Sequence, residues 1–137
     1  MGRCKVALFG EAERGAVGTP LTMHSLSELN EKLGHPPSDS QGLLFAIQFL
    51  LFEQEVIYVR VQEKEFSTRD YLNGIKDFEA KVDTSNLIAF CLPGVGDARI
   101  FHAVDPILSA YEALMITTQK DLYDYMTSLP RKQERFQ

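Results

Sequence analysis

The chain has no tryptophan, two cysteines and three histidines among its 137 residues. So few cysteines exclude a disulfide framework, and no CxxC or Cys/His cluster has the ligand spacing of a zinc site. Cys4 and Cys91 each border an apolar run, which favours two buried thiols in a reducing compartment. A bridge between them stays open, because it requires the two strand ends to lie side by side.

Positive charge is also scarce, with 14 Lys and Arg against 19 Asp and Glu and a formal net charge of −5. Basic residues gather only at Arg131, Lys132 and Arg135, and Glu134 interrupts them. A protein that recognises nucleic-acid backbones needs lysine and arginine massed on one face. The composition therefore predicts no nucleic-acid partner.

Long apolar runs are absent as well. The longest, Leu43–Phe52, contains Gln48 and falls far short of the roughly 20 residues that span a bilayer. The stretch Val6–Gly10 is too short for the core of a signal peptide. We expect a cytoplasmic protein with no membrane partner, folded as one domain over residues 1–137 with a frayed polar tail at 131–137.

The chain does contain alternating strand and helix patterns. Strands are predicted at Lys5–Gly10, Leu21–His24, Val56–Gln62, Asn86–Leu92 and Ala113–Thr117. Helices are predicted at Leu26–Leu33, Gln41–Glu55, Arg69–Val82, Ala98–Ala110 and Lys120–Leu129, where Pro130 stops the last one. This order predicts a single α/β domain with a mostly parallel or mixed sheet of four or five strands flanked by helices.

Individual residues add detail to the predictions for three of the helices. Ser25 is a helix N-cap, Glu28 completes a capping box, and Gly34 ends the same helix. The helix Gln41–Glu55 is apolar on nearly all sides, which predicts a central place in the core. Pro106 predicts a new segment or a kink within Ala98–Ala110.

Two glycine-bearing loops are the candidates for ligand binding. The loop Gly10–Gly18 matches neither GxGxxG nor a P-loop, and Glu11 and Glu13 would repel an anion. In the loop Pro93–Asp97, the aspartate either caps the following helix or holds a metal or a ribose hydroxyl. A small nucleotide- or phosphate-binding protein stays an alternative, provided that both loops lie at the same edge of the sheet.

Catalytic groups do not assemble in the sequence. No GxSxG turn occurs, no two histidines share a metal-ligand spacing, and no acid, base and nucleophile combine. Arg60 stands inside an apolar strand, on the same face as Val56 and Tyr58, so it needs an acidic partner in the chain or a neighbouring subunit. We expect a non-enzymatic protein without metal or cofactor.

The ordered series of segments resembles the body of contractile phage tail sheath proteins and their relatives in contractile injection systems. The first half reads ALFGEAERGAVGTP, PLTMHSLSELNEKLG, LLFAIQFLLFEQEV and VIYVRVQ; the second half reads YLNGIKDFEAKV, NLIAFCLPGVGD and ALMITTQKDLYDYM. Together they cover roughly Val6–Leu129. The pattern falls on Gly10, Glu13, Arg14, Gly15, Pro20, Ser25, Gly34, Tyr58, Arg60, Pro93 and Gly94.

The resemblance implies a structural protein that self-associates or binds other sheath or tail components, located in the cytoplasm or in a tail particle. Ala16 stands where the family usually has proline, and Glu53–Glu55 stands where it often has glycines. Sheath subunits also carry a C-terminal domain and arms that add strands to neighbouring subunits. We expect this chain to keep the body and to lack those parts.

Overall fold

The computed structural model describes residues 4–128; the predicted tail at 131–137, together with Leu129 and Pro130, lies outside them. The strands are β1 (Lys5–Gly10), β2 (Pro20–Met23), β3 (Glu55–Arg60), β4 (Leu87–Cys91) and β5 (Leu114–Ile116). The helices are α1 (Leu26–Leu33), α2 (Gln41–Leu51), α3 (Thr68–Lys81), α4 (Ala98–Tyr111) and α5 (Gln119–Ser128). Both sets agree with the predicted elements to within a few residues.

All five strands form one sheet in the order β2-β3-β1-β4-β5. β1 lies in the centre and pairs in parallel with β3 and β4, and β5 continues the parallel set beyond β4. β2 returns antiparallel to β3 and forms the other edge. The predicted α/β fold is confirmed, and the sheet is mixed with five strands.

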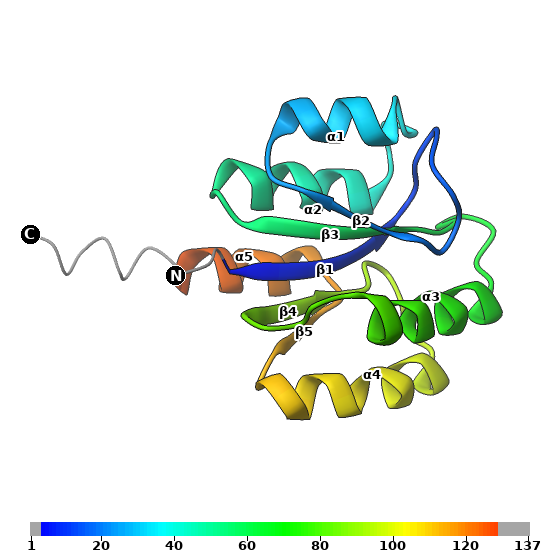
Figure 1. The fold of residues 1–137 in the computed structure, drawn as a ribbon, viewed down its shortest axis with the longest axis vertical. Coiled ribbons are helices and arrows are strands. Elements are labelled where there is room, and N and C mark those ends of the chain that lie inside the picture. Colours follow the sequence, from blue (N-terminus) through cyan, green and yellow to red (C-terminus); the bar gives the residue numbers. More distant parts are fainter. Residues whose placement is uncertain (1–3, 129–137) are drawn as a thin grey trace, which may run out of the picture.

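Helices cover both faces of this sheet, with α1 and α2 on one side and α3 and α4 on the other (Figure 1). One core joins α1, α2 and α5 to the sheet, and a second core joins α3 and α4 to the opposite face. Alternation along β3 divides its side chains as predicted: Val56 and Tyr58 enter the first core, whereas Ile57, Val59 and Val61 enter the second.

The caps of α1 follow the sequence. The Ser25 hydroxyl accepts a hydrogen bond from the Glu28 N–H, and Gly34 ends the helix with a φ of 72°. The Glu28 carboxylate accepts from the N–H of His24 at 2.6 Å, one residue before the usual capping-box partner. This bond is the main reason why the pKa of Glu28 is lowered.

The predicted place of α2 in the core is confirmed for its inner face, where Phe45, Phe49 and Leu50 are buried, but two details of the prediction are wrong. The helix ends at Leu51, because Glu53 adopts a left-handed φ of 61° that breaks the helical pattern before the predicted end at Glu55. Its outer face is not in the core either: Leu44, Leu51 and Phe52 are 42%, 58% and 43% exposed. Although α2 is apolar on nearly all sides, only one of its faces is buried and the other is exposed to solvent.

Pro106 begins no new segment, because α4 runs continuously from Ala98 to Tyr111. Pro106 lacks an N–H and leaves the carbonyl of His102 without its helical donor. Both residues are exposed, so that carbonyl lies on the solvent side of the helix, where a missing donor costs least. Within residues 4–128, no helix has the length and apolar character that a bilayer span requires.

Candidate functional site

The loop that follows β1 is fixed to the end of α1. The N–H groups of Glu13 and Arg14 donate to the carbonyl of Leu33 at 2.8 and 3.2 Å. The Glu13 carboxylate accepts from the N–H of His35 at 2.8 Å. Gly34 lies between these contacts, where a Cβ would collide with the Glu13 carboxylate. Three of the family-pattern positions, Glu13, Arg14 and Gly34, therefore form one joint.

The same loop is tied to the end of β3 through Arg60. One Nη of Arg60 donates to the carbonyl of Gly15 at 2.6 Å, and the N–H of Gly18 donates to the carbonyl of Arg60 at 3.0 Å. Arg60 is half-buried, and no carboxylate of residues 4–128 lies within ion-pair distance of it. Its partner within the described residues is thus a loop carbonyl rather than an acid, and the contact with a neighbouring subunit stays a prediction.

Tyr58 of β3 holds the start of the same loop. Its hydroxyl donates to the carbonyl of Glu11 at 2.7 Å, and the side chain is fully buried. Burial, with the Glu63 carboxylate nearby, raises the pKa of Tyr58 well above its usual value. Gly10 and Gly42 touch here: a Cβ on Gly42 would lie 2.5 Å from the Cα of Gly10. The first turn of α2 therefore packs directly on the end of β1.

Glu63, in the loop after β3, occupies the position at which an α/β protein usually binds an anion. One carboxylate oxygen accepts from the N–H of Gln41 at 2.8 Å. The other accepts from the Ser40 hydroxyl and from the N–H groups of Gly42 and Glu11, at 2.5, 3.2 and 2.8 Å. The N-terminus of α2 and the end of β1 are thus satisfied by a side chain of the protein itself.

Glu11 in turn binds the backbone of the loop that carries Glu63. Its carboxylate accepts from the N–H of Glu63 at 2.7 Å and from that of Lys64 at 3.4 Å. The two acidic residues exchange backbone and side-chain hydrogen bonds and hold their loops together. Sequence reasoning missed Glu63, because nothing local in VQEKEF distinguishes it from its neighbours; only the fold brings it to α2.

The loops Pro93–Asp97 and Gly10–Gly18 both lie at the carboxyl ends of the strands, because β1 and β4 are adjacent parallel strands. This meets the geometric condition for the phosphate-binding alternative. The N–H of Gly94 donates to the carbonyl of Thr117 at 2.8 Å, while Pro93 is buried. The N–H groups of Glu11, Gly18, Gly94 and Val95 are among the loop donors that already bond within the chain.

Asp97 caps α4 through the N–H of Arg99 at 2.8 Å. It also accepts from the Arg99 guanidinium at 3.0 Å and from the Thr68 hydroxyl at 2.8 Å, which joins the N-termini of α3 and α4. These hydrogen bonds, the guanidinium first, lower the pKa of Asp97 to about 2. The sequence left two roles open for Asp97, and the structure shows it in the role of helix cap.

Four family-pattern residues lie outside the cluster after β1: Pro93 and Gly94 in the loop after β4, and Pro20 and Ser25 beside β2. Pro20 begins β2, and Ser25 caps the start of α1 at the opposite end of that helix from Gly34. Both shape the edge of the sheet rather than the joint after β1. The structure thus divides the pattern into a cluster at the carboxyl ends of β1 and β3, two residues after β4, and two residues near the ends of β2.

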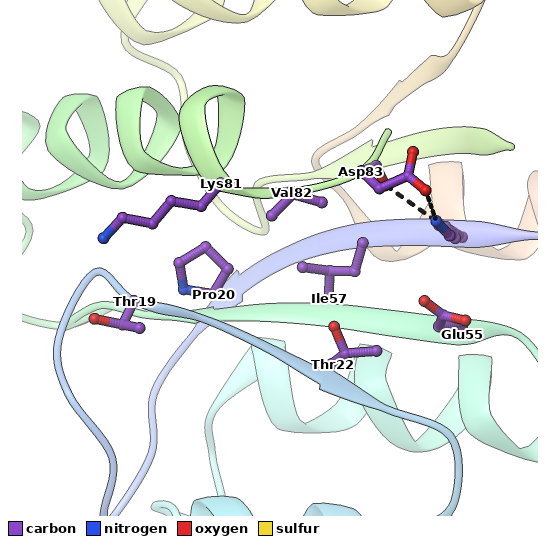
Figure 2. Close-up of a pocket in the computed structure, with 9 residues that line it drawn as sticks. Thr19, Pro20, Thr22, Glu55, Ile57, Lys81, Val82 and Asp83 are labelled. Atoms are coloured by element: carbon purple, nitrogen blue, oxygen red, sulfur yellow. Dashed lines mark hydrogen bonds and ion pairs between the residues drawn. The ribbon is translucent and has the colours of Figure 1, made fainter. Parts of the chain in front are cut away.

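A groove of about 270 Å³ lies beside β2, close to the last residues of α3 (Figure 2). Ile57 and Pro20 supply apolar walls. The Lys5 ammonium in it donates to the carbonyl of Asp83 at 3.0 Å and lies 3.6 Å from its carboxylate. The Glu55 carboxylate contacts the imidazole of His24 at 3.2 Å. Its charged groups are thus engaged with partners of the chain.

The two cysteines lie far apart in the structure. Cys91 lies beside Leu8 in the register of β1 and β4, four residues along the strand from Cys4, or roughly 13 Å. That separation is too large for a disulfide, and both cysteines are free. Burial raises the pKa of the Cys91 thiol. In the part of the chain that the structure describes, no three His, Cys, Asp or Glu side chains form a metal-binding group.

Comparisons with known proteins give no relative: no protein family, no curated protein and no solved structure matches the chain.

Proposed function

We propose that the chain is a structural, non-enzymatic, sheath-like subunit that self-associates or docks onto a contractile phage tail or injection-type apparatus. The observation that carries the proposal is the difference between the two edges of the sheet. One edge is blocked against a further strand, and the other is open beside a groove.

The blocked edge is β2. Pro20 has no N–H to offer to an added strand. The Lys32 ammonium of α1 donates to the carbonyl of Thr22 at 2.6 Å, so one acceptor of the strand is already engaged. Proline and lysine are common means of preventing strand addition at a sheet edge.

The open edge is β5. The carbonyl of Ile116 accepts from the N–H of Leu92, which turns the backbone of Ile116 toward β4. Backbone direction alternates along a strand, so the N–H and carbonyl of Met115 point outward. Leu114 is 55% exposed beside them. The edge offers both a donor and an acceptor to an added strand.

A groove of about 250 Å³ runs between β5 and α5 next to this edge. Asp121, Asp124 and Tyr125 line it from α5. Since β5 has three residues, few ladder bonds are available, and side-chain contacts in the groove have to supply much of the affinity. Asp124 is already paired with the Lys120 ammonium at 3.1 Å, so Asp121 is the carboxylate that favours an extended segment carrying lysine or arginine.

The cluster after β1 supports the same proposal. Its glycines, Arg60 and Tyr58 are engaged in fixing loops, and Glu63 holds the anion position. These groups give the domain a fixed shape for packing against neighbours. The resemblance to sheath bodies supplies the kind of assembly, and strand addition is the contact used by that family.

The test is assembly in solution. Static light scattering and negative-stain microscopy over a range of concentrations are expected to detect rings, tubes or stacked particles. Met115→Pro removes the outward N–H at an edge position that tolerates proline, and it is expected to suppress assembly without unfolding the domain. Thr22→Pro, on the blocked edge, is the matched control and should leave assembly intact.

Absence of assembly at every concentration contradicts self-association. Docking is tested separately by the gene neighbourhood, where tube, baseplate and ATPase-like genes are expected beside this one. Their absence from complete genomes that carry the gene contradicts a role in a contractile apparatus.

One observation favours the phosphate-binding alternative: the loops Gly10–Gly18 and Pro93–Asp97 lie side by side at the carboxyl ends of β1 and β4. Binding there would have to displace Glu63 from the first turn of α2. A thermal-shift screen of the wild-type protein with nucleotides and inorganic phosphate decides between the proposals, and a ligand-dependent rise in melting temperature favours the alternative.

A further inference from the structure

A charge-free face lies on the side of the molecule formed by α2 and α5. It consists of Leu44, Gln48, Leu51 and Phe52 of α2 and its C-cap, with Tyr123 of α5. The four large apolar side chains are exposed at 42%, 58%, 43% and 67% for Leu44, Leu51, Phe52 and Tyr123. From Gln41 to Phe52 the sequence has no Asp, Glu, Lys or Arg. The largest apolar patch on a protein surface is often functional.

A shallow groove of about 230 Å³ separates the two helices within this face. Its lining is uncharged throughout: Leu44, Gln48, Gln119, Leu122, Tyr123 and Met126. It is a different surface from the β5 edge, whose groove is acidic.

The absence of charge identifies the occupant. The protein carries a net charge of −5, so two copies repel each other over most of their surfaces. The charge-free face is where two copies approach with least repulsion and without desolvating an ion. A basic partner would instead be attracted to the acidic groove at β5.

The spacing along α2 is suited to a twofold contact. Leu44 and Leu51 are seven residues, or roughly 10 Å, apart on one side of the helix, with Gln48 between them. When two copies of α2 cross antiparallel at Gln48, Leu44 of each copy meets Leu51 of the other, as a self-complementary interface requires. A glutamine amide both donates and accepts, so the two Gln48 side chains bond across the axis.

We propose that the protein forms a twofold symmetric dimer through the charge-free face, centred on Gln48 of α2. The exposed apolar side chains supply on the order of a few hundred Å² per copy, less than the roughly 800 Å² of a standard interface. The dimer is therefore expected to dissociate at micromolar rather than nanomolar concentration. The inference is independent of the β5 edge and of any contractile apparatus.

Sedimentation velocity over a range of protein concentrations tests the dimer. The wild-type protein is expected to pass from monomer to dimer, and Leu51→Glu to weaken association by tenfold or more, because it places two carboxylates in the interface. Tyr111→Glu is the matched control: Tyr111 is 45% exposed on α4, on the opposite side of the sheet, and its substitution should leave the dimer unchanged. Circular dichroism and melting temperature confirm that both variants are folded.

Cross-linking tests the position of the axis. In a Cys4→Ser background, Gln48→Cys is expected to form an intermolecular disulfide on mild oxidation, whereas Tyr111→Cys is not. A monomer at all concentrations overturns the proposal, as does a dimer that survives Leu51→Glu. A dimer that Met115→Pro dissociates belongs to the β5 edge and equally overturns it.

Discussion

The carboxylate of Glu63 accepts a hydrogen bond from the backbone N–H of Gln41 at 2.8 Å, in the first turn of a helix more than twenty residues earlier in the chain. Through this contact the loop after β3 satisfies donors of α2 that would otherwise bind water or a ligand. Because Glu63 occupies these donors, an anion can bind at the carboxyl end of β1 only by displacing it. Substitution of Glu63 therefore tests the phosphate-binding alternative directly.

Glu63→Ala is expected to destabilise the domain by about 2 kcal/mol, because it removes a charged acceptor shared by several donors. Added sulfate should then raise the melting temperature of this variant more than that of the wild type, since the vacated helix N-terminus accepts an anion. Glu65→Ala, exposed in the same loop, is the control and should change stability by less than about 0.5 kcal/mol. Equal sulfate effects on all three proteins would show that Glu63 does not hold an anion position.

Gly42→Ala is expected to destabilise the protein by about 1–3 kcal/mol or more, since the new Cβ meets the backbone of Gly10 at 2.5 Å and the Tyr58 hydroxyl at 2.8 Å. Gly96→Ala has nothing within 4 Å of its added Cβ, and it should be neutral or slightly stabilising. Urea unfolding of both variants provides the measurement. Similar stabilities for the two would contradict the close approach of α2 to β1.

Glu53→Gly is expected to stabilise the domain by roughly 0.5–1 kcal/mol. The residue has a φ of 61°, which costs an L-residue about 1–2 kcal/mol, and glycine avoids that cost while losing more chain entropy on folding. Glu53→Ala keeps the left-handed strain and serves as the control. A glycine variant no more stable than the alanine variant in chemical denaturation would refute this origin of strain.

Acid should reveal the hydrogen bonds of Asp97. Its folded-state pKa of about 2 lies below the ordinary value of 3.8, so the ionised carboxylate stabilises the fold above about pH 4. This contribution is lost as the pH falls toward 2. Asp97→Asn should therefore lose less stability than the wild type between pH 4 and pH 2, measured by urea unfolding. Asp105→Asn, exposed on the same helix, should follow the wild-type curve; parallel curves for all three would disprove the role of Asp97.

Much of the fold could be predicted because the decisive signals are local. The apolar run Lys5–Gly10, the cap at Ser25 and the stop at Gly34 each fix an element through its own residues. The alternation in β3 likewise divides its side chains between two cores. These features depend on spacing along the chain, which the sequence displays directly.

The errors arise where tertiary surroundings decide. Periodicity showed that α2 is apolar but could not show that no other element covers Leu51. Pro106 interrupts the hydrogen-bond pattern, yet solvent at its exposed position makes the interruption inexpensive. The contact of Glu63 with α2 was invisible for the same reason, since it joins segments that only the fold brings together.

The central position of β1 has a consequence for synthesis of the protein. Its two neighbours, β3 and β4, begin about 50 and about 80 residues later in the chain. At a ribosomal rate of about 5–20 residues per second, the first strand waits on the order of ten seconds for its second partner. During that time Val6, Leu8 and Phe9, which are fully buried in the folded domain, lack the cover of β4, so a nascent chain paused before Leu87 is expected to be a substrate for holdase chaperones.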